Sequence, residues 1–307
     1  MNEHKQKKLR AMWPSRVQFN VSMAAYSTLR AGGQAAALIE LHALDELQRL
    51  LLQLNTEEIT SLIIGRGSNI LVADSGYPGV IIRLLGAFNT IAVQKNARGA
   101  AVRAGAGCPL ATLVSWCTGH GLSGLEFMVG IPGSVGGAVR MNAGAWGEEI
   151  GVPLQEIETV DCKGHIQYFS ANELRPTYRR LELADGSFEN MVITSAVFQL
   201  ERDQEEQIRS RCRSYLDGRR GKQPVGVASA GSFFKNPQGD SAGRLIEAAG
   251  LKGFCCGQAM VSPVHANFIV NQGKATATEI ITLMEQVQQT VFQQFAVRLQ
   301  PEVHIFQ

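Results

Sequence analysis

The chain has 307 residues, 45% of them hydrophobic and 18% charged, so it can form packed cores and is not a disordered protein. Its formal net charge of +2 argues against a strongly basic surface for nucleic acid. No apolar run reaches the roughly 18 residues of a membrane span, and no signal-peptide run follows the basic start. We therefore expect a cytoplasmic protein that binds neither nucleic acid nor membranes. Glycine is the outlier, with 32 residues.

The first part of the chain shows strand and helix patterns in turn. Residues 1–22 begin with several basic residues and are expected to be a solvated tail. Leucines at helical spacing predict a helix over 44–54. Pro109 suits the first turn of a helix over 110–118. Short apolar runs predict strands at 61–64, 70–72, 80–84 and 100–104.

The second part continues with strands and then becomes charged and helical. Strands are predicted at 155–162, 166–169 and 191–200, and the helical segment 201–216 is a plausible domain boundary. Further on, a helix at 243–249, a strand at 265–271 and a terminal strand at 302–306 are predicted. Thr276 and Glu279 form a capping box that opens a long helix, which we expect Pro301 to stop.

Two glycine-rich loops are the main candidates for chemistry. The first is Gly65-Arg66-Gly67-Ser68-Asn69, and the second is Gly130-Ile131-Pro132-Gly133-Ser134-Val135-Gly136-Gly137. Such loops let backbone N–H groups converge on phosphates, but they also serve as tight turns, and their spacing does not decide between the two. Neither loop is a dinucleotide fingerprint or carries a Walker lysine. No cysteine or histidine cluster has metal-ligand spacing, so no metal is expected.

The ordered motifs resemble the UDP-N-acetylenolpyruvoylglucosamine reductase (MurB) family of bacterial peptidoglycan precursor synthesis, from about Ser22 to Phe306. The resemblance rests on the two glycine loops and on the segments 30–33, 104–107, 124–126, 142–145, 230–237, 265–271 and 301–303. It implies an α+β fold with an FAD-binding domain of the vanillyl-alcohol-oxidase (PCMH) type over 23–202. That domain would have two α+β subdomains, about 23–85 and 86–202, followed by an α+β substrate domain over 203–307.

The resemblance also implies the activity. The family reduces the enolpyruvyl ether of a UDP-sugar to UDP-N-acetylmuramate, with FAD as cofactor and NADPH as co-substrate. The segment between Arg179 and Ser232 is short, as in the compact type that lacks an extra substrate-capping loop. A monomer is expected.

The family's site residues match positions of this chain. Arg179, Ser232 and Glu302 match the catalytic residues: a guanidinium beside the substrate carboxylate stabilises developing charge, and the serine protonates C2. FAD would be bound by the residues 65–69, by Gly130, Ile131, Pro132, Gly133, Ser134, Gly136 and Gly137, and by Asn142 and Gly144 near the ring. Substrate would be bound by Tyr178, Lys222, Lys235 and Asn236.

Departures from the family pattern and other functions stay open. Leu181 and Leu183 replace a usual serine and an aromatic residue, so a hydroxyl that could orient the arginine is missing or replaced. Tyr26-Ser27 replaces a family His-Thr, and His265 and His304 are interpreted as structural. An FAD-dependent hydroxy-acid oxidase or dehydrogenase, or a non-catalytic nucleotide-binding relative, are the alternative functions.

Overall fold

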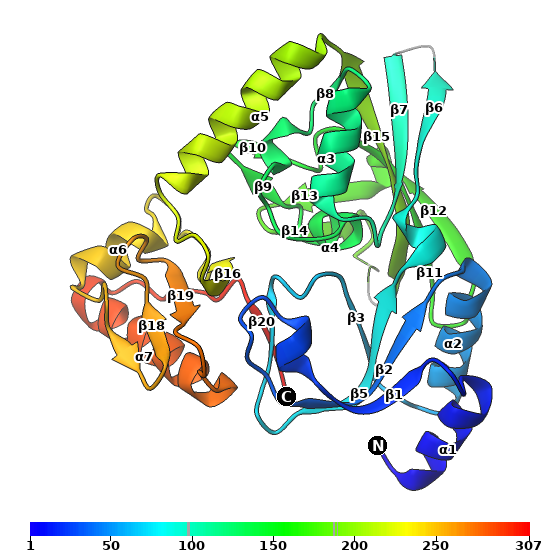
Figure 1. Ribbon diagram of the computed structural model, residues 1–307, viewed down its shortest axis with the longest axis horizontal. Helices are drawn as coiled ribbons and strands as arrows, with labels where there is room; N and C mark the ends of the chain where they lie inside the picture. The colour runs from blue at the N-terminus through cyan, green and yellow to red at the C-terminus, as the bar shows by residue number, and fades with distance from the viewer. Residues whose placement is uncertain (97–98, 187, 189) are drawn as a thin grey trace. The chain divides into compact units, whose positions relative to one another are not determined.

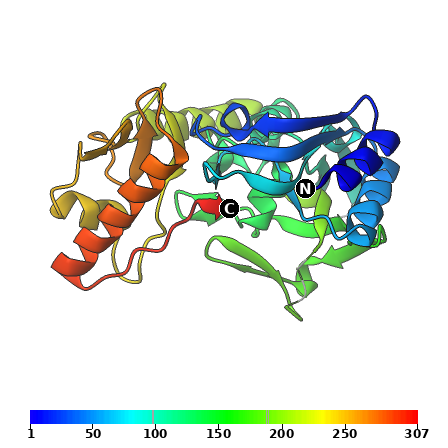
Figure 2. The same ribbon diagram turned by 90° about the horizontal axis from the view of Figure 1, so that it is seen from below.

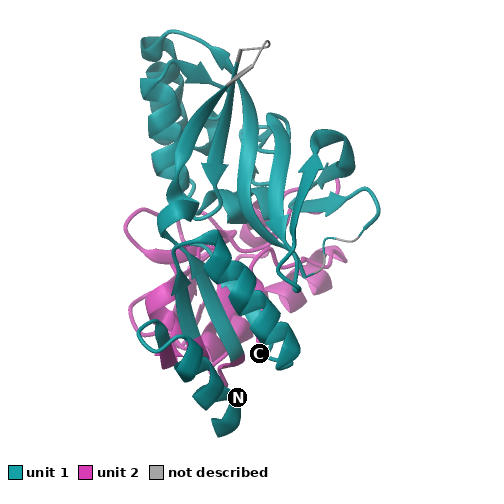
Figure 3. Ribbon diagram, turned by 90° about the vertical axis from the view of Figure 1, so that its right-hand side faces the viewer, with its two compact units in different colours: residues 1–17, 38–65, 79–218 teal, residues 18–37, 66–78, 219–307 magenta. Residues whose placement is uncertain are grey.

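The computed structural model describes residues 1–96, 99–186, 188 and 190–307. The chain divides into two compact units, each assembled from separate segments (Figure 3). The first unit comprises residues 1–17, 38–65 and 79–218, and the second comprises 18–37, 66–78 and 219–307. Both combine helices with strands, which confirms the α+β class. The domain boundaries expected at residues 22, 85 and 202 remain predictions.

An antiparallel sheet forms the centre of the first unit (Figure 1). Its strand order is β12-β11-β15-β7-β6, and β8 also pairs with β15. The first seven residues of β15 are all buried, as expected for a strand covered on both faces. The strands are β6 (Ile91–Asn96), β7 (Gly99–Gly105), β8 (Leu122–Ser123), β11 (Leu154–Val160), β12 (Ile166–Ser170) and β15 (Val192–Arg202).

Helices and two short hairpins complete this unit. Helix α4 (Val135–Arg140) packs on β15 and β7, and α3 (Leu110–Gly119) packs on β8. Pro109 is the residue that caps α3, so the predicted helix start is confirmed. The hairpins pair β9 (Gly144–Ala145) with β10 (Glu148–Glu149), and β13 (Leu174–Thr177) with β14 (Arg180–Leu183). The charged segment forms α5 (Glu205–Arg220).

The N-terminal segment is ordered, so its interpretation as a solvated tail is wrong. Residues 3–12 form helix α1 (Glu3–Met12), in which Leu9 is fully buried. The ammonium group of Lys8 pairs with Glu57, and Trp13 Nε1 donates to Gln53 Oε1 at 3.1 Å, which ties α1 to α2 (Leu44–Thr56). The few apolar residues here lie among charged ones, so the segment has too weak a hydrophobic pattern to reveal this docking.

A second sheet has the order β1-β2-β5-β3. Strands β3 and β5 pair in parallel, with Ser61 opposite Val80. The sequence patterns predicted β3 and β5 and missed β1 and β2. The four strands are β1 (Val17–Ser22), β2 (Gln34–Leu41), β3 (Ser61–Ile64) and β5 (Tyr77–Leu84).

In the second unit a four-stranded sheet of order β16-β19-β18-β17 packs against helices. Figure 2 shows α7 (Ala277–Phe295) as the long orange helix beside this sheet, and it contacts β17, β18, β19 and α6 (Ala242–Ala248). The C-terminal strand β20 (His304–Phe306) pairs in parallel with β4 (Ile70–Val72). The remaining strands are β16 (Ala228–Ser232), β17 (Cys255–Cys256), β18 (Ala259–Val261) and β19 (Phe268–Asn271).

Helix α7 begins as predicted and ends earlier. Thr276 and Glu279 form the reciprocal hydrogen bonds of a capping box. The carboxylate of Asp74 also accepts the N–H groups of Ala277 and Thr278, at 3.0 and 2.8 Å. The helix ends at Phe295 because Ala296 adopts a left-handed conformation with φ 58°, so the prediction that Pro301 stops it was wrong.

Candidate active site

Main-chain contacts bring the segment of Ser232 against the segment of Glu302. The N–H of Glu302 donates to the carbonyl of Phe233 at 2.8 Å. Two residues earlier, the carbonyl of Gln300 accepts the N–H of Lys235 at 2.8 Å. Two of the three predicted catalytic residues therefore lie on adjacent segments of the second unit.

A buried amide holds the residues that follow Ser232. Asn267 is buried, and its side chain forms two hydrogen bonds with the main chain of Phe234, at 2.9 and 2.8 Å. The main-chain carbonyl of Asn267 accepts the N–H of Phe233 at 2.7 Å. The sequence reasoning missed Asn267 as a supporting residue, although an asparagine directly before the apolar run of β19 was a visible signal.

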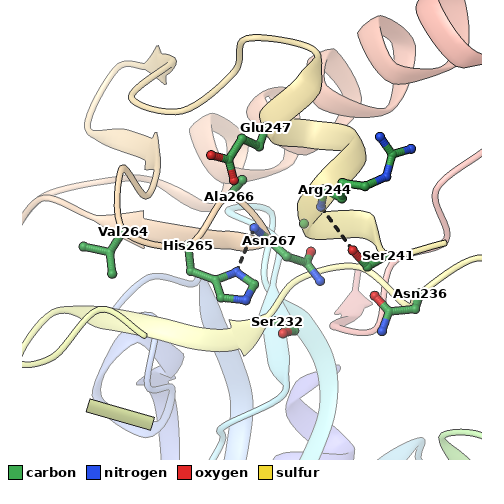
Figure 4. Close-up of a pocket in the computed structure, with 10 residues that line it drawn as sticks. Ser232, Asn236, Ser241, Arg244, Glu247, Val264, His265, Ala266 and Asn267 are labelled. Atoms are coloured by element: carbon green, nitrogen blue, oxygen red, sulfur yellow. Dashed lines mark hydrogen bonds between the residues drawn. The ribbon is translucent and has the colours of Figure 1, made fainter. Parts of the chain in front are cut away.

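Ser232 lines a pocket of about 390 Å³ in the second unit (Figure 4). Its polar walls include Asn236, Arg244 and His265. The Nδ1 of His265 accepts the N–H of Asn267 at 3.2 Å, and burial lowers the pKa of this histidine. Both effects favour the neutral imidazole, so His265 offers hydrogen-bonding groups, and the charged groups of the lining are Arg244 and Glu247.

The predicted substrate residues of this unit differ in exposure. Lys222 and Asn236 are exposed, and Lys235 is half-buried. The side-chain oxygen of Asn236 accepts the N–H of Ala242 at 3.1 Å, so this residue also supports the first turn of α6. Their contacts with a substrate stay predictions.

The first glycine loop reaches the Glu302 segment through Asn69. The side-chain amide of Asn69 donates to the carbonyl of Glu302 at 2.9 Å. Its own carbonyl accepts the N–H of His304 at 3.0 Å. Residues 66–69 thus lie beside a predicted catalytic residue within the second unit.

Close packing explains the glycine at position 65 but not the one at position 137. A Cβ on Gly65 would lie 2.2 Å from Ser134 Oγ, so Gly65 packs closely on Ser134 within the first unit. A Cβ on Gly137 would make only an ordinary contact, 3.6 Å from the same oxygen. Gly137 is exposed in the first turn of α4, so its missing side chain leaves backbone open to a ligand, as an FAD phosphate would require.

Not every amide of the second loop is available to a phosphate. The N–H of Gly136 donates to the carbonyl of Ala106 at 2.8 Å, and that of Ile131 donates to Met128 at 3.1 Å. A contact of Gly136 or Ile131 with a cofactor would have to involve atoms other than their main-chain N–H groups.

Arg179 lies in the first unit, on the two-residue turn between β13 and β14. It is half-buried and adopts φ 60°, a conformation rare for non-glycine residues. Its Nη1 donates to the carbonyl of Gly144 at 3.2 Å, and its guanidinium carbon lies 5.2 Å from the centre of the Tyr178 ring. The side chain is therefore oriented by a carbonyl and by an aromatic ring.

Comparison with known proteins decides the family. The chain is 40% identical over 293 residues to UDP-N-acetylenolpyruvoylglucosamine reductase 2 of Symbiobacterium thermophilum, covering 95% of this chain and 93% of that protein. It is 43% identical over 283 residues to the UDP-N-acetylenolpyruvoylglucosamine reductase of Pelobacter propionicus, covering 92% and 93%. This chain belongs to the UDP-N-acetylenolpyruvoylglucosamine reductase family.

Two family models and a solved structure agree with this assignment. Residues 223–306 match the C-terminal domain of UDP-N-acetylenolpyruvoylglucosamine reductase, and residues 35–170 match an FAD binding domain. The crystal structure of the reductase (MurB) from Thermus caldophilus superposes with a TM-score of 0.80 at 38% identity. It covers 95% of this chain and 99% of that one.

In this member of the reductase family, the two leucines after Arg179 are buried. Leu181 and Leu183 lie on β14, and their buried side chains pack the β13–β14 hairpin into the core of the first unit. They offer no hydroxyl to the arginine, so other groups must orient it.

Within the described ranges, no helix is long and apolar enough to cross a membrane. Nor do the described side chains include a group of three or more His, Cys, Asp and Glu placed to hold a metal ion.

Proposed function

We propose that this chain reduces UDP-N-acetylenolpyruvoylglucosamine to UDP-N-acetylmuramate, as an FAD-dependent oxidoreductase that consumes NADPH. The observation that carries the proposal is family membership along almost the whole chain. The Ser232 and Glu302 segments support it, because main-chain hydrogen bonds hold them together in the second unit. The chemistry that FAD supplies when bound is transfer of a hydride from NADPH to C3 of the enolpyruvyl group.

The chain's own residues would handle charge and the proton. As C3 gains a hydride, negative charge develops at C2 and on the adjacent carboxylate. We assign Arg179 to stabilise this charge, because a guanidinium matches a carboxylate. Ser232 gives a proton to C2, which completes reduction of the double bond, and Glu302 completes the catalytic set.

The polar groups beside Ser232 support a substrate site in the second unit. We assign the pocket of Figure 4 to part of the UDP-sugar, since its neutral imidazole and amide groups suit a polar ligand. Lys222, Lys235 and Tyr178 are further substrate contacts. Residues 65–69 and 130–137 would meet the FAD phosphates, with Asn142 and Gly144 near the ring.

The purified protein is expected to be yellow. Under anaerobic conditions NADPH should bleach the flavin absorbance, and UDP-N-acetylenolpyruvoylglucosamine should restore it. A protein that cannot be loaded with FAD would contradict the proposal. Rapid recovery of colour with oxygen, and none with the UDP-sugar, would favour a hydroxy-acid oxidase. Bound flavin that responds to neither NADPH nor the UDP-sugar would indicate a non-catalytic relative.

We further propose that the enzyme acts as a cytoplasmic monomer, and that its product supports cell shape and division through peptidoglycan synthesis. Light scattering coupled to size-exclusion chromatography should give a mass near 33.3 kDa. A mass of twice that value would rule out the monomer.

A further inference from the structure

The side chain of Asn142 joins three segments of the first unit. It is fully buried, with an exposed fraction of 0%. Its Nδ2 donates to Glu149 Oε2 at 2.7 Å and to the carbonyl of Thr177 at 3.0 Å. Its Oδ1 accepts the N–H of Gly151 at 3.0 Å. Both polar atoms therefore bind the protein itself.

These partners determine which way the amide faces. The carbonyl of Thr177 accepts hydrogen bonds and cannot donate them, and Glu149 supplies a carboxylate, so both require the nitrogen of Asn142. The N–H of Gly151 requires the oxygen. A Cβ on Gly151 would lie 2.7 Å from Asn142 Oδ1, so glycine at position 151 leaves room for the amide in this orientation. Burial and three hydrogen bonds thus hold Asn142 in one orientation.

The same contacts lead to Arg179 by two routes. Thr177, whose carbonyl is held by Asn142, precedes Arg179 by two residues at the end of β13. On the other side, Arg179 Nη1 donates to the carbonyl of Gly144. Gly144 is the cross-strand partner of Glu149 in the β9–β10 hairpin. The contacts form a closed ring that runs through Asn142, Glu149, Gly144, Arg179 and Thr177.

Helix α5 holds the hairpin that belongs to this ring. The hydroxyl of Tyr215 donates to Glu148 Oε1 at 2.8 Å, next to Glu149. The ring of Trp146, in the turn of the hairpin, stacks on Tyr215 with 5.7 Å between ring centres. These contacts with α5 stabilise the hairpin. The hairpin in turn binds the Asn142 amide through Glu149 and the Arg179 guanidinium through Gly144.

We propose that Asn142, held by Glu149, is a positioning residue for Arg179 in the reaction with the enolpyruvyl substrate. The inference rests on the role proposed above for Arg179. The carbonyl of Gly144 supplies the contact to the guanidinium that Leu181 and Leu183 do not offer, and Asn142 acts on it through Glu149. Misplacing a guanidinium by about 1 Å weakens its contact with developing charge and slows the chemical step by up to roughly 10²-fold. The side chain of Asn142 does this by binding protein groups, independently of any contact of its main chain with FAD.

Asn142→Gly is the direct test, because glycine accepts the φ of 43° at this position without strain and removes only the side chain. We expect flavin reoxidation by the UDP-sugar to slow by about 10- to 100-fold at saturating substrate. The matched control is Asn190→Gly, at an exposed residue with φ 62°, which should leave this rate unchanged.

The decisive comparison repeats Asn142→Gly in the Arg179→Ala background. If Asn142 acts through Arg179, the second substitution should cost little more once the arginine is gone. Additive losses would overturn the inference. If Arg179→Ala alone leaves reoxidation unchanged, the assignment of Arg179 in the proposed function fails. If Arg179→Ala slows reoxidation and Asn142→Gly does not, only the positioning role fails.

A second pair of variants covers the case in which Asn142→Gly does not fold. Glu149→Gln keeps an oxygen that can accept from the Asn142 amide, whereas Glu149→Ala removes it. Glu149→Ala should slow reoxidation by the UDP-sugar about tenfold, and Glu149→Gln should recover most of that loss. Equal rates in the two variants would overturn the inference.

Discussion

Ser232→Ala is expected to leave flavin reduction by NADPH within about twofold of the wild-type rate and to slow reoxidation by the UDP-sugar by about 10²- to 10⁴-fold. The substitution removes one hydroxyl from the end of β16, where Ser232 pairs with Phe268. The following residues are buried and held by Asn267, so the backbone should not shift. Anaerobic stopped-flow absorbance would measure the two half-reactions separately.

Ser229→Ala provides the matched control for this experiment. Ser229 lies on the same strand and pairs with Val270, and its hydroxyl has no role in the proposed reaction. Both half-reactions should keep their wild-type rates in this variant. Equal losses in the two half-reactions of Ser232→Ala would show that the hydroxyl is not the proton donor.

Arg211→Ala should lower the melting temperature by roughly 5–10 °C, because it leaves a buried carboxylate without its cation. Glu126 is 7% exposed and accepts from Ser123 Oγ, from the N–H of Gly124 and from Arg211. Removing one partner of a fully buried ion pair costs about 3–5 kcal/mol. The side chain of Arg211 is 40% exposed, so we expect about 2–3 kcal/mol.

Arg209→Ala is the control for the loss of Arg211. Arg209 pairs with Glu205 one turn away on the exposed side of α5, and such pairs contribute only about 0.2–0.5 kcal/mol. Thermal unfolding of both variants, followed by circular dichroism, makes the comparison. Equal melting temperatures in the two variants would show that the buried pair does not anchor α5.

The effect of Arg211→Ala should depend on pH in a defined direction. Burial acts to raise the pKa of Glu126, but hydrogen bonds from the Gly124 N–H and from Arg211 outweigh it and hold the pKa below 4.5. A carboxylate with a lowered pKa stabilises the fold above its unfolded pKa, and that contribution is lost as the pH falls through the folded pKa. Asp203, which also binds Arg211, has a lowered pKa too and acts in the same direction.

The difference in melting temperature between wild type and Arg211→Ala should therefore be largest near neutral pH and shrink below about pH 4.5. A melting series in buffers on both sides of that pH would measure it. A difference that grows on acidification would contradict the assignment of Glu126 as an ionised partner.

Elements with a strong local pattern were predictable, and elements stabilised by distant contacts were not. The capping box of Thr276 and Glu279 involves residues three apart, so the sequence alone located the start of α7. Its end depended on the left-handed conformation of Ala296, for which the sequence carries no glycine signal. Helix α1 was missed because its partners are distant in the sequence. Glu57 lies 49 positions after Lys8, and Gln53 lies 40 positions after Trp13.

The ordered motifs of the sequence determined the family by resemblance, and with it the expected α+β class. Local periodicity located several of the helices and strands. Tertiary structure decided how some of the candidate residues are held. Main-chain pairing set Glu302 beside the Ser232 segment. Asn142 bonds residues 7, 9 and 35 positions away, and such partners leave no periodic trace in a sequence. Hydrogen bonds between distant segments form only when the chain is folded, so the ring of contacts around Arg179 was visible only in the structure.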